Sequence, residues 1–214
     1  MKKLITAALL FCLTLGNLPA IAASQSNDRD LNADVYMFTK SEQATLKQIE
    51  AKLNQITTLQ SRFKQTNADG SEVMGTFYLS RPGKMRIEYD PPIKNFIVAT
   101  GTFLVYWDDE MQQQSHTTIG SSLADIILRK EIRFGERLKL CGFETKGQLY
   151  KVCLTDSENQ DQGTFSLFLD KTNFTLKQWT VEDLMGKLTT VNLLDPHYNV
   201  SFNDSIFRFT KPQQ

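Results

Sequence analysis

The sequence predicts a mainly β protein, in which about a dozen short strands follow one helix near the N-terminus. Apolar residues first recur at helical spacing, and from about residue 59 onward they recur at every second position. Turn residues, such as those of the stretch Asn67–Gly70, separate the apolar runs at hairpin spacing. Short strands at this spacing predict a meandering antiparallel sheet that curls into a sandwich or a barrel.

An amphipathic helix is predicted over residues 41–57. Thr39 and Glu42 form a capping-box motif at its start. The apolar residues at helical spacing are Leu46, Ile49, Leu53, Ile56, Leu59 and Phe63. Since the opposite face is polar, the helix must lie with its apolar side against another part of the molecule.

The strands are predicted from alternating apolar residues bounded by turns. Their ranges are Leu59–Thr66, Ser71–Ser80, Lys84–Tyr89, Asn95–Thr100, Phe103–Asp108, Glu110–Thr117, Leu138–Thr145, Gln148–Asp156, Gly163–Asp170, Leu176–Glu182, Leu188–Leu194 and Ser205–Phe209. Met85, Ile87 and Tyr89 share one face of the most regular strand. A short apolar helix over residues 123–130, with a serine cap at its start, interrupts the series.

The first 22 residues have the features of a secretory signal peptide. Lys2 and Lys3 precede the apolar run Leu4–Leu15, which is short for a membrane span, and Ala20–Ala22 matches a cleavage signal. We expect cleavage after Ala22, with cleavage after Ala23 as the alternative. An uncleaved anchor helix is the less favoured interpretation.

The mature chain is expected to be exported and soluble. Cys12 lies inside the apolar run, not directly after a cleavage site, so lipidation is not expected. Residues 23–38 are polar and aperiodic, which predicts a flexible mature N-terminus. Residues 39–214 have a suitable length for one domain with a core of its own.

Cys141 and Cys153 are the cysteines that remain after cleavage, in an oxidising compartment. Symmetric pairing of the predicted hairpin about Gly147 places them opposite each other, so a disulfide is the favoured interpretation and two separate buried thiols the alternative. Their spacing is not a metal-binding pattern, and His116 and His197 stand alone. We expect no metal and no cofactor.

The charges and motifs argue against nucleic-acid binding and catalysis. Lysine and arginine number 24 and the acids 24, and removal of two leader lysines leaves 24 − 2 = 22 bases against 24 acids. Neither a nucleophile motif nor a glycine-rich phosphate loop is present. The run Asp108–Glu110 is interpreted as a solvated turn. A hydrolase whose site is assembled only in space is the less favoured alternative.

Phenylalanine is frequent, with 14 of 214 residues. This composition fits a packed core or an apolar ligand cavity, and it does not distinguish between them.

Taken in order, the motifs resemble the outer-membrane lipoprotein carrier protein family, LolA. The most specific part is the G-x-F-x-L-x-R-P-G-K-x-R-x-E-Y run over Gly75–Tyr89. The other matching pieces are Leu59–Gln65, Pro91-Pro92, a glycine-centred hairpin with Leu104–Asp108, the apolar helix near Ile126 and the closing Ile206–Thr210. The resemblance covers nearly the whole mature chain.

The resemblance implies an incomplete, unclosed β-barrel in which the N-terminal helix and short mid-chain helices form a lid over an apolar cavity. It implies that the protein carries lipoproteins through the periplasm of a Gram-negative bacterium, from an inner-membrane ATP-driven transporter to an outer-membrane acceptor lipoprotein of similar fold. The missing lipidation cysteine favours carrier over acceptor, and a monomer is expected. A periplasmic lipoprotein sensor is the alternative; such sensors have a second domain, for which the chain leaves no length.

The resemblance also implies site residues. Arg81 is expected to bond to the lid and hold the closed form, and a surface arginine is the alternative. The expected lid residues are Leu46, Ile49, Leu53, Ile56, Leu123, Ile126 and Ile127. The expected cavity residues are Phe77, Leu79, Met85, Ile87, Tyr89, Phe96, Val98, Phe103, Val105 and Trp107. The family usually has aromatic residues where this chain has Met85 and Ile87, which predicts a softer cavity surface.

Overall fold

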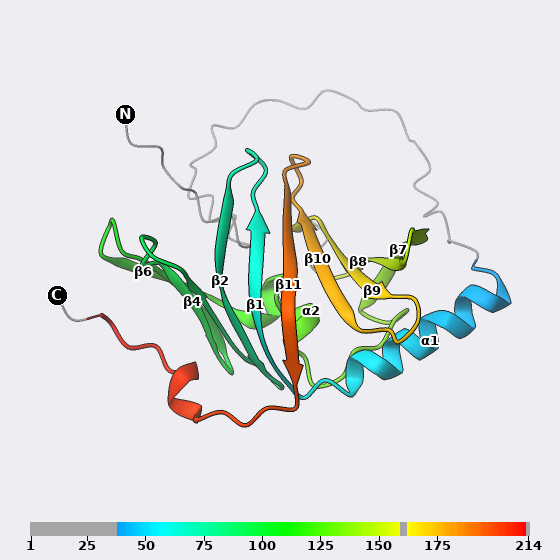
Figure 1. The fold of residues 1–214 in the computed structure, drawn as a ribbon, viewed down its shortest axis with the longest axis horizontal. Coiled ribbons are helices and arrows are strands. Elements are labelled where there is room, and N and C mark those ends of the chain that lie inside the picture. The colour runs from blue at the N-terminus through cyan, green and yellow to red at the C-terminus, as the bar shows by residue number, and fades with distance from the viewer. Residues whose placement is uncertain (1–37, 159–161, 213–214) are drawn as a thin grey trace.

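One antiparallel sheet of eleven strands dominates the structure, a computed structural model that describes residues 38–158 and 162–212 (Figure 1). The strands are β1 (Thr58–Thr66), β2 (Glu72–Ser80), β3 (Lys84–Tyr89), β4 (Phe96–Thr100), β5 (Phe103–Asp108), β6 (Gln113–Thr118), β7 (Leu138–Lys146), β8 (Leu149–Asp156), β9 (Thr164–Asp170), β10 (Leu176–Glu182) and β11 (Leu188–Tyr198). The predicted signal peptide 1–22, Cys12 and residues 23–37 lie outside the described residues.

The strand order explains why the sheet is an incomplete barrel. It runs β6-β5-β4-β3-β2-β1-β11-β10-β9-β8-β7, so the first strand pairs with the last in the middle of the sheet. Strands β6 and β7 form the two outer edges and do not pair with each other. The chain passes from one edge to the other through residues 119–137, which contain the 3₁₀ helix η1 (Ile119–Ser121) and the helix α2 (Asp125–Leu128). The prediction of an unclosed antiparallel barrel is confirmed.

The helix α1 (Lys40–Asn54) begins where the capping box predicted. The backbone N–H of Glu42 donates to the Thr39 hydroxyl at 3.2 Å, and the N–H of Thr39 donates to the Glu42 carboxylate at 2.8 Å. The N–H of Thr39 and then its hydroxyl, which both donate to the Glu42 carboxylate, lower the pKa of Glu42. The helix ends three residues before the predicted limit, so Ile56 lies in the connection to β1.

Two predicted elements near the barrel openings differ from the structure. The mid-chain helix spans only Asp125–Leu128. Its N-cap residue is Ala124, which supplies no side-chain cap, and the Ser122 hydroxyl donates to the Ile119 carbonyl instead. The predicted last strand, Ser205–Phe209, is wrong. The 3₁₀ helix η3 (Asp204–Phe207) forms there, and the Asn203 side chain accepts from the N–H of Ser205 at 3.0 Å.

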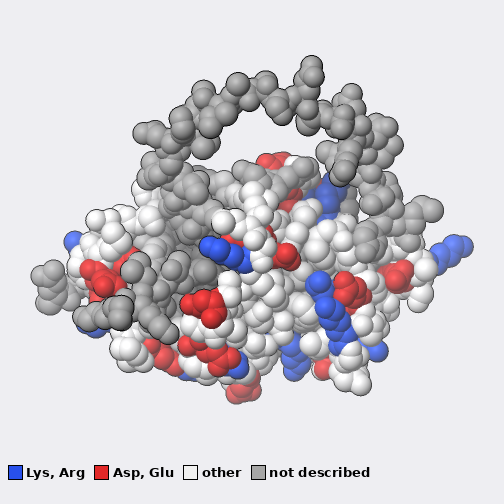
Figure 2. Space-filling view, turned by 90° about the horizontal axis from the view of Figure 1, so that it is seen from above, with Lys and Arg blue, Asp and Glu red and all other residues white. Residues whose placement is uncertain are grey.

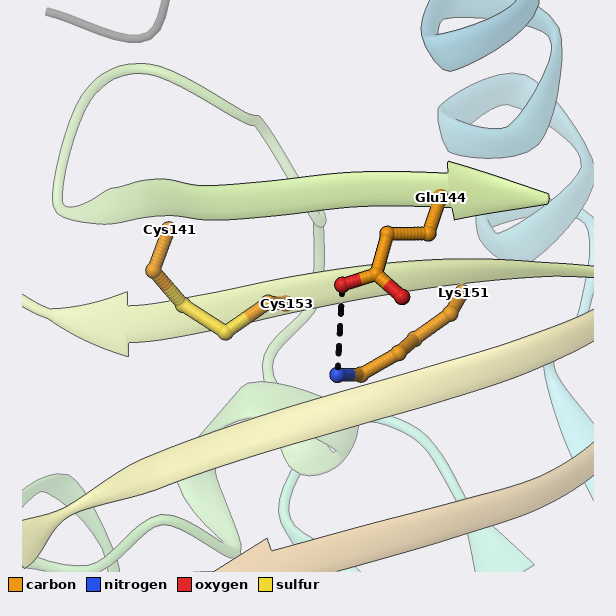
Figure 3. The surroundings of a disulfide bond; sticks show 4 residues. All are labelled: Cys141, Glu144, Lys151 and Cys153. Atoms are coloured by element: carbon orange, nitrogen blue, oxygen red, sulfur yellow. Dashed lines mark ion pairs between the residues drawn. A yellow bond between two sulfur atoms is a disulfide. The ribbon is translucent and has the colours of Figure 1, made fainter. Parts of the chain in front are cut away.

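A disulfide joins Cys141 of β7 to Cys153 of β8 (Figure 3). Leu140 pairs with Leu154, whereas Gly142 pairs with Cys153, so Cys141 occupies a β-bulge rather than a symmetric position about the turn. The extra residue shifts the register of the hairpin. The bond therefore fastens an edge strand at the place where regular pairing is interrupted.

Candidate functional site

The concave face of the sheet carries the main apolar core. Antiparallel pairing places Phe77 beside Ile87 and Leu79 beside Met85, and all four are buried in this core together with Tyr89. The motif residue Gly75 lies under the Phe63 ring, and a Cβ atom at Gly75 would come within 2.6 Å of that ring. Five of the ten predicted cavity residues therefore do lie on the inner face.

Two separate parts of the chain cover this face, and we call them together the lid: α1 and the covering segment, residues 119–137. Leu46, Ile49 and Leu53 of α1, together with Ile56 just after it, bury their side chains against the core. Ile119, Leu123, Ala124, Ile126, Ile127, Leu128 and Ile132 of the covering segment are buried in the same cluster. All seven predicted lid residues thus contact the inner core.

Hydrogen bonds join the two parts of the lid. The Asn54 side chain donates to the Ile132 carbonyl at 2.9 Å and accepts from the Ile132 N–H at 2.8 Å. The N–H of Phe134 donates to the Glu50 carboxylate at 2.6 Å. The end of α1 and the second half of the covering segment are therefore bonded to each other as well as to the sheet.

Beneath the lid the core encloses a cavity of about 10 Å³. It is lined by Leu53, Ile56, Leu59, Phe77, Leu79, Arg81, Ile127, Ile132, Leu167, Leu176 and Trp179. That volume holds roughly one water molecule, whereas ligand pockets measure roughly 300–1,000 Å³. The structure is therefore a closed form, in which the apolar side chains of lid and sheet fill the interior.

Arg81, in the turn between β2 and β3, bonds to both parts of the lid at once. Its Nε atom donates to the Ile127 carbonyl at 2.7 Å, and an Nη atom donates to the carbonyls of Leu53 at 2.6 Å and Ile56 at 3.3 Å. Leu53 lies in the last turn of α1, where its carbonyl also accepts from the N–H of Ile56 at 3.2 Å, and Ile56 lies just after the helix. One guanidinium thus satisfies acceptors on two segments that are far apart in sequence.

Burial lowers the pKa of Arg81 to about 10, because removal from water disfavours the cation. The ion pairs among the described residues include none with Arg81. Its charge is therefore supported by carbonyl dipoles alone, and the side chain remains a cation at neutral pH.

A second charged cluster fastens the ends of the covering segment to β8. The Nε atom of Arg137 donates to both oxygens of Asp156, at 2.9 and 3.0 Å, and the buried Asp156 also accepts from the N–H of Glu158. Arg137 reaches the Gly120 carbonyl at 2.7 Å, at the other end of the segment. Arg129 lies 3.7 Å from Asp156. Sequence analysis missed this cluster, because its members belong to distant segments.

Four of the predicted cavity residues lie on the opposite face. Phe96, Val98, Val105 and Trp107 form a separate buried cluster against Phe209 of the C-terminal segment. Phe103 is exposed at the end of β5. The prediction failed because β4 is buried on both sides, so its alternation does not show which side faces inward. Ile97, Ala99 and Leu104 face the inner core instead.

The C-terminal segment covers that outer cluster. The Phe209 ring lies 5.8 Å from Phe96 and 6.2 Å from Trp107, and the Arg86 guanidinium lies 4.6 Å from the Phe96 ring centre. The segment crosses the sheet below β2 and β4 in Figure 1. The cluster is thus shielded from water, and none of it lines the cavity.

Sequence analysis also missed cavity residues from the second half of the sheet, namely Leu167, Leu176 and Trp179. Residues 165–169 are all buried, and their unbroken burial gives no information about the inner face. These residues line the same cavity as Leu53 of α1, and Figure 1 shows α1 on the side of β9.

Charged side chains of both signs are interspersed over the face shown in Figure 2. In the part of the chain that the structure describes, no helix has the length and apolar character needed to cross a membrane.

The structure is thus an unclosed antiparallel barrel with an apolar interior, covered by a lid whose two parts both bond to Arg81. The family model "Outer membrane lipoprotein carrier protein LolA" matches residues 54–210. The chain belongs to this family, which takes its name from carriage and not from a catalysed reaction.

Two relatives agree in sequence with this assignment, and a solved structure has a similar fold. An outer-membrane lipoprotein carrier protein of Methylococcus capsulatus is 22% identical, over 81% of this chain and 87% of the relative. One of Chromobacterium violaceum is 27% identical, over 78% of this chain and 83% of the relative. A solved LolA superfamily protein from Nitrosomonas europaea superimposes with a TM-score of 0.43 and 12% identity, over 76% of this chain and 97% of that one.

Proposed function

We propose that this protein binds the acyl chains of lipoproteins between the concave face of its sheet and the displaced lid. The matching family and the names of the relatives support lipoproteins as cargo. The lining supports acyl chains as the bound part, since all its side chains except Arg81 are apolar. Each methylene group kept from water contributes about 0.8 kcal/mol, so an acyl chain needs such a shield in water.

The observation that carries the proposal is the bonding of Arg81 to Ile127, Leu53 and Ile56 above a closed interior. Cargo can enter only after the lid moves, and lid movement breaks these bonds. The free energy of opening is subtracted from the binding energy of the acyl chains, so the net affinity is moderate. A carrier that must release cargo without nucleotide hydrolysis requires such moderate affinity.

The matching family supports a route of transport between two membranes. We place the mature protein in the periplasm, after cleavage of residues 1–22, as a monomer. It receives lipoproteins from an inner-membrane ATP-driven transporter and delivers them to an outer-membrane acceptor lipoprotein. Residues 39–214 act as a single carrier domain.

The direct test is release of a labelled lipoprotein from inner-membrane vesicles that contain the transporter. With the protein and ATP present, we expect a soluble complex with one lipoprotein per carrier. If the lipoprotein stays in the membrane fraction under all conditions, the proposal is wrong.

Arg81→Leu tests the mechanism in the same assay. This variant should form the soluble complex and then transfer its cargo to acceptor-containing vesicles at least about tenfold more slowly, because opening costs less free energy. Arg62→Leu is the matched control, since Arg62 is an arginine of β1 that pairs with Asp90 at the exposed surface and not with the lid. Equal transfer by wild type and both variants would remove Arg81 from the mechanism.

A further inference from the structure

The two free edges of the sheet differ in chemistry. Edge strand β6 consists of Gln113, Gln114, Ser115, His116, Thr117 and Thr118, with no acid, lysine, arginine or proline. Edge strand β7 contains Lys139, Glu144 and Lys146, and it is interrupted by the bulge at Cys141. Charged side chains and bulges are the usual protection of an edge against pairing with another chain. β7 is protected in this way, and β6 is not.

The β6 edge is also well formed and accessible. All six of its residues pair with β5, and the Ser121 hydroxyl contacts the hydroxyl groups of Thr117 and Thr118 at 3.3 and 2.6 Å. Four of its six residues are exposed. Among the described residues no strand pairs with its outer side. The edge therefore presents backbone N–H and C=O groups in a fixed, extended arrangement.

The position of β6 relates this edge to the cavity. The covering segment begins directly after Thr118, so the end of β6 lies beside the lid. Figure 1 places α1 on the side of β7 and β9, away from β6. A polypeptide that left the interior beside the end of β6 would therefore emerge on the side away from α1.

We propose that the β6 edge binds the extended, uncharged peptide segment that follows the acylated residue of the cargo, as one added strand. This inference rests on the proposed function. Backbone hydrogen bonds give little sequence preference, which suits a carrier for lipoproteins of different sequence. The acyl chains supply most of the affinity, and the strand fixes the peptide beside the lid.

The small area of the β6 edge favours cargo, rather than a second copy of this chain, as the bound partner. A stable interface between two proteins buries roughly 1,200–2,000 Å², and a single six-residue edge contributes only a part of that. A peptide whose acyl chains already lie in the cavity is held at an effective concentration on the order of millimolar. The weak contact that the edge can make is sufficient only for such a tethered partner.

The test uses a synthetic lipopeptide, a diacylglyceryl cysteine followed by six serine, threonine and glycine residues. Two compounds serve as comparisons. One is the same lipopeptide with N-methylated peptide bonds, and the other is a diacylglyceryl cysteine amide without peptide. We expect the N-methylated compound to bind about tenfold more weakly than the lipopeptide, which corresponds to about 1.4 kcal/mol. The unmodified lipopeptide should slow hydrogen exchange at amides of β6 and leave exchange at amides of β7 unchanged. The other two compounds should slow neither.

The outcomes separate this inference from the proposed function. Binding of all three compounds with equal affinity and no protection of β6 would overturn the strand addition and leave acyl-chain binding intact. Failure of all three to bind would contradict the proposed function itself. Protection of β6 that grows with protein concentration, without any lipopeptide, would show that a second copy occupies the edge and would also overturn the inference.

Discussion

Two charged residues next to the lid, Arg81 and Asp156, differ in the partners that stabilise their charge. Arg81 bonds only to carbonyls, whereas Asp156 lies between Arg137 and Arg129. The pKa of Arg81 in the folded protein lies below its ordinary value, so the cation is less favourable in the folded protein than in the unfolded chain. This contribution opposes folding below pH 10, which includes neutral pH, and it is relieved as the pH rises above 10. The bonds to the lid carbonyls offset that cost.

Arg81→Lys should separate the charge of this residue from its geometry. A lysine keeps the cation, but its compact ammonium group cannot reach carbonyls in the directions that the planar guanidinium serves. We expect the free energy of unfolding to fall by about 1–3 kcal/mol, since buried lid carbonyls lose their donor. Urea unfolding measures this loss. Unchanged stability, together with unchanged hydrogen exchange at Ile127, would contradict the role given to the guanidinium group of Arg81.

Asp156→Asn should loosen the ends of the covering segment. Removal of one charge from a buried pair leaves the other without compensation, although Arg137 is partly exposed and can regain water. We expect a loss of about 1–3 kcal/mol in the free energy of unfolding. Glu131→Gln is the control, because the pair of Glu131 with Arg133 is exposed and should change stability by less than about 0.5 kcal/mol. Equal effects of both substitutions would show that the Asp156 cluster does not fasten the lid.

At the scale of elements, α1 and the covering segment behave as one cover because side chains of α1 bond to the backbone of the segment. Asn54 uses both its donor and its acceptor on Ile132. Periodicity predicted α1 and its inward face. It did not predict this bonding, since the partners are 78 residues apart.

Asn54→Ala should release the covering segment from α1. The amides of Ile132 and Phe134 should exchange at least about tenfold faster, because tenfold corresponds to about 1.4 kcal/mol, within the range for a lost pair of hydrogen bonds. Asn95→Ala is the matched control, because the Asn95 side chain bonds to the Tyr106 hydroxyl beside β5 and not to the lid. Site-resolved hydrogen exchange by NMR makes the comparison. Equal rates in the wild type and the Asn54 variant would show that the two parts of the lid move separately.

Replacing both cysteines with alanine should weaken the edge hairpin without opening the lid. The disulfide spans 12 residues, and closure of a loop of that length is worth about 3 kcal/mol in the chain-entropy treatment. We expect a loss of about 2–3 kcal/mol in thermal or urea unfolding. Exchange at Ile127 and Ile132 should stay as in the wild type relative to global unfolding. Faster lid exchange in this variant would connect the disulfide to cargo entry.

At the scale of the molecule, the sheet separates two apolar clusters, an inner one under the lid and an outer one under the C-terminal segment. The inner cluster is packed almost without free volume in the closed form. Under the proposed function, cargo would displace lid side chains and take over their contacts. The outer cluster does not have to rearrange when cargo binds, and it keeps the opposite face of the sheet covered.

The two tryptophans report on the two clusters separately. Trp179 lines the cavity and Trp107 lies in the outer cluster. Acyl-chain binding should change the fluorescence of Trp107→Phe, which keeps Trp179, by about the wild-type amount. In Trp179→Phe the change should be nearly lost. The reverse result would place the ligand on the outer face of the sheet.

The sequence alone predicted the succession of antiparallel strands and the capped helix, and it singled out Arg81 in the R-P motif. These features depend on local periodicity and on the order of motifs. The sequence was not sufficient for the inner face of β4 and β5, since a strand buried on both sides has no polar side to orient it. Only the tertiary structure revealed that Phe96 and Trp107 lie outside the cavity, and that Leu167 and Trp179 lie within it. It also decided what Arg81 contacts, because its three carbonyl acceptors belong to two distant segments that only the closed fold brings together.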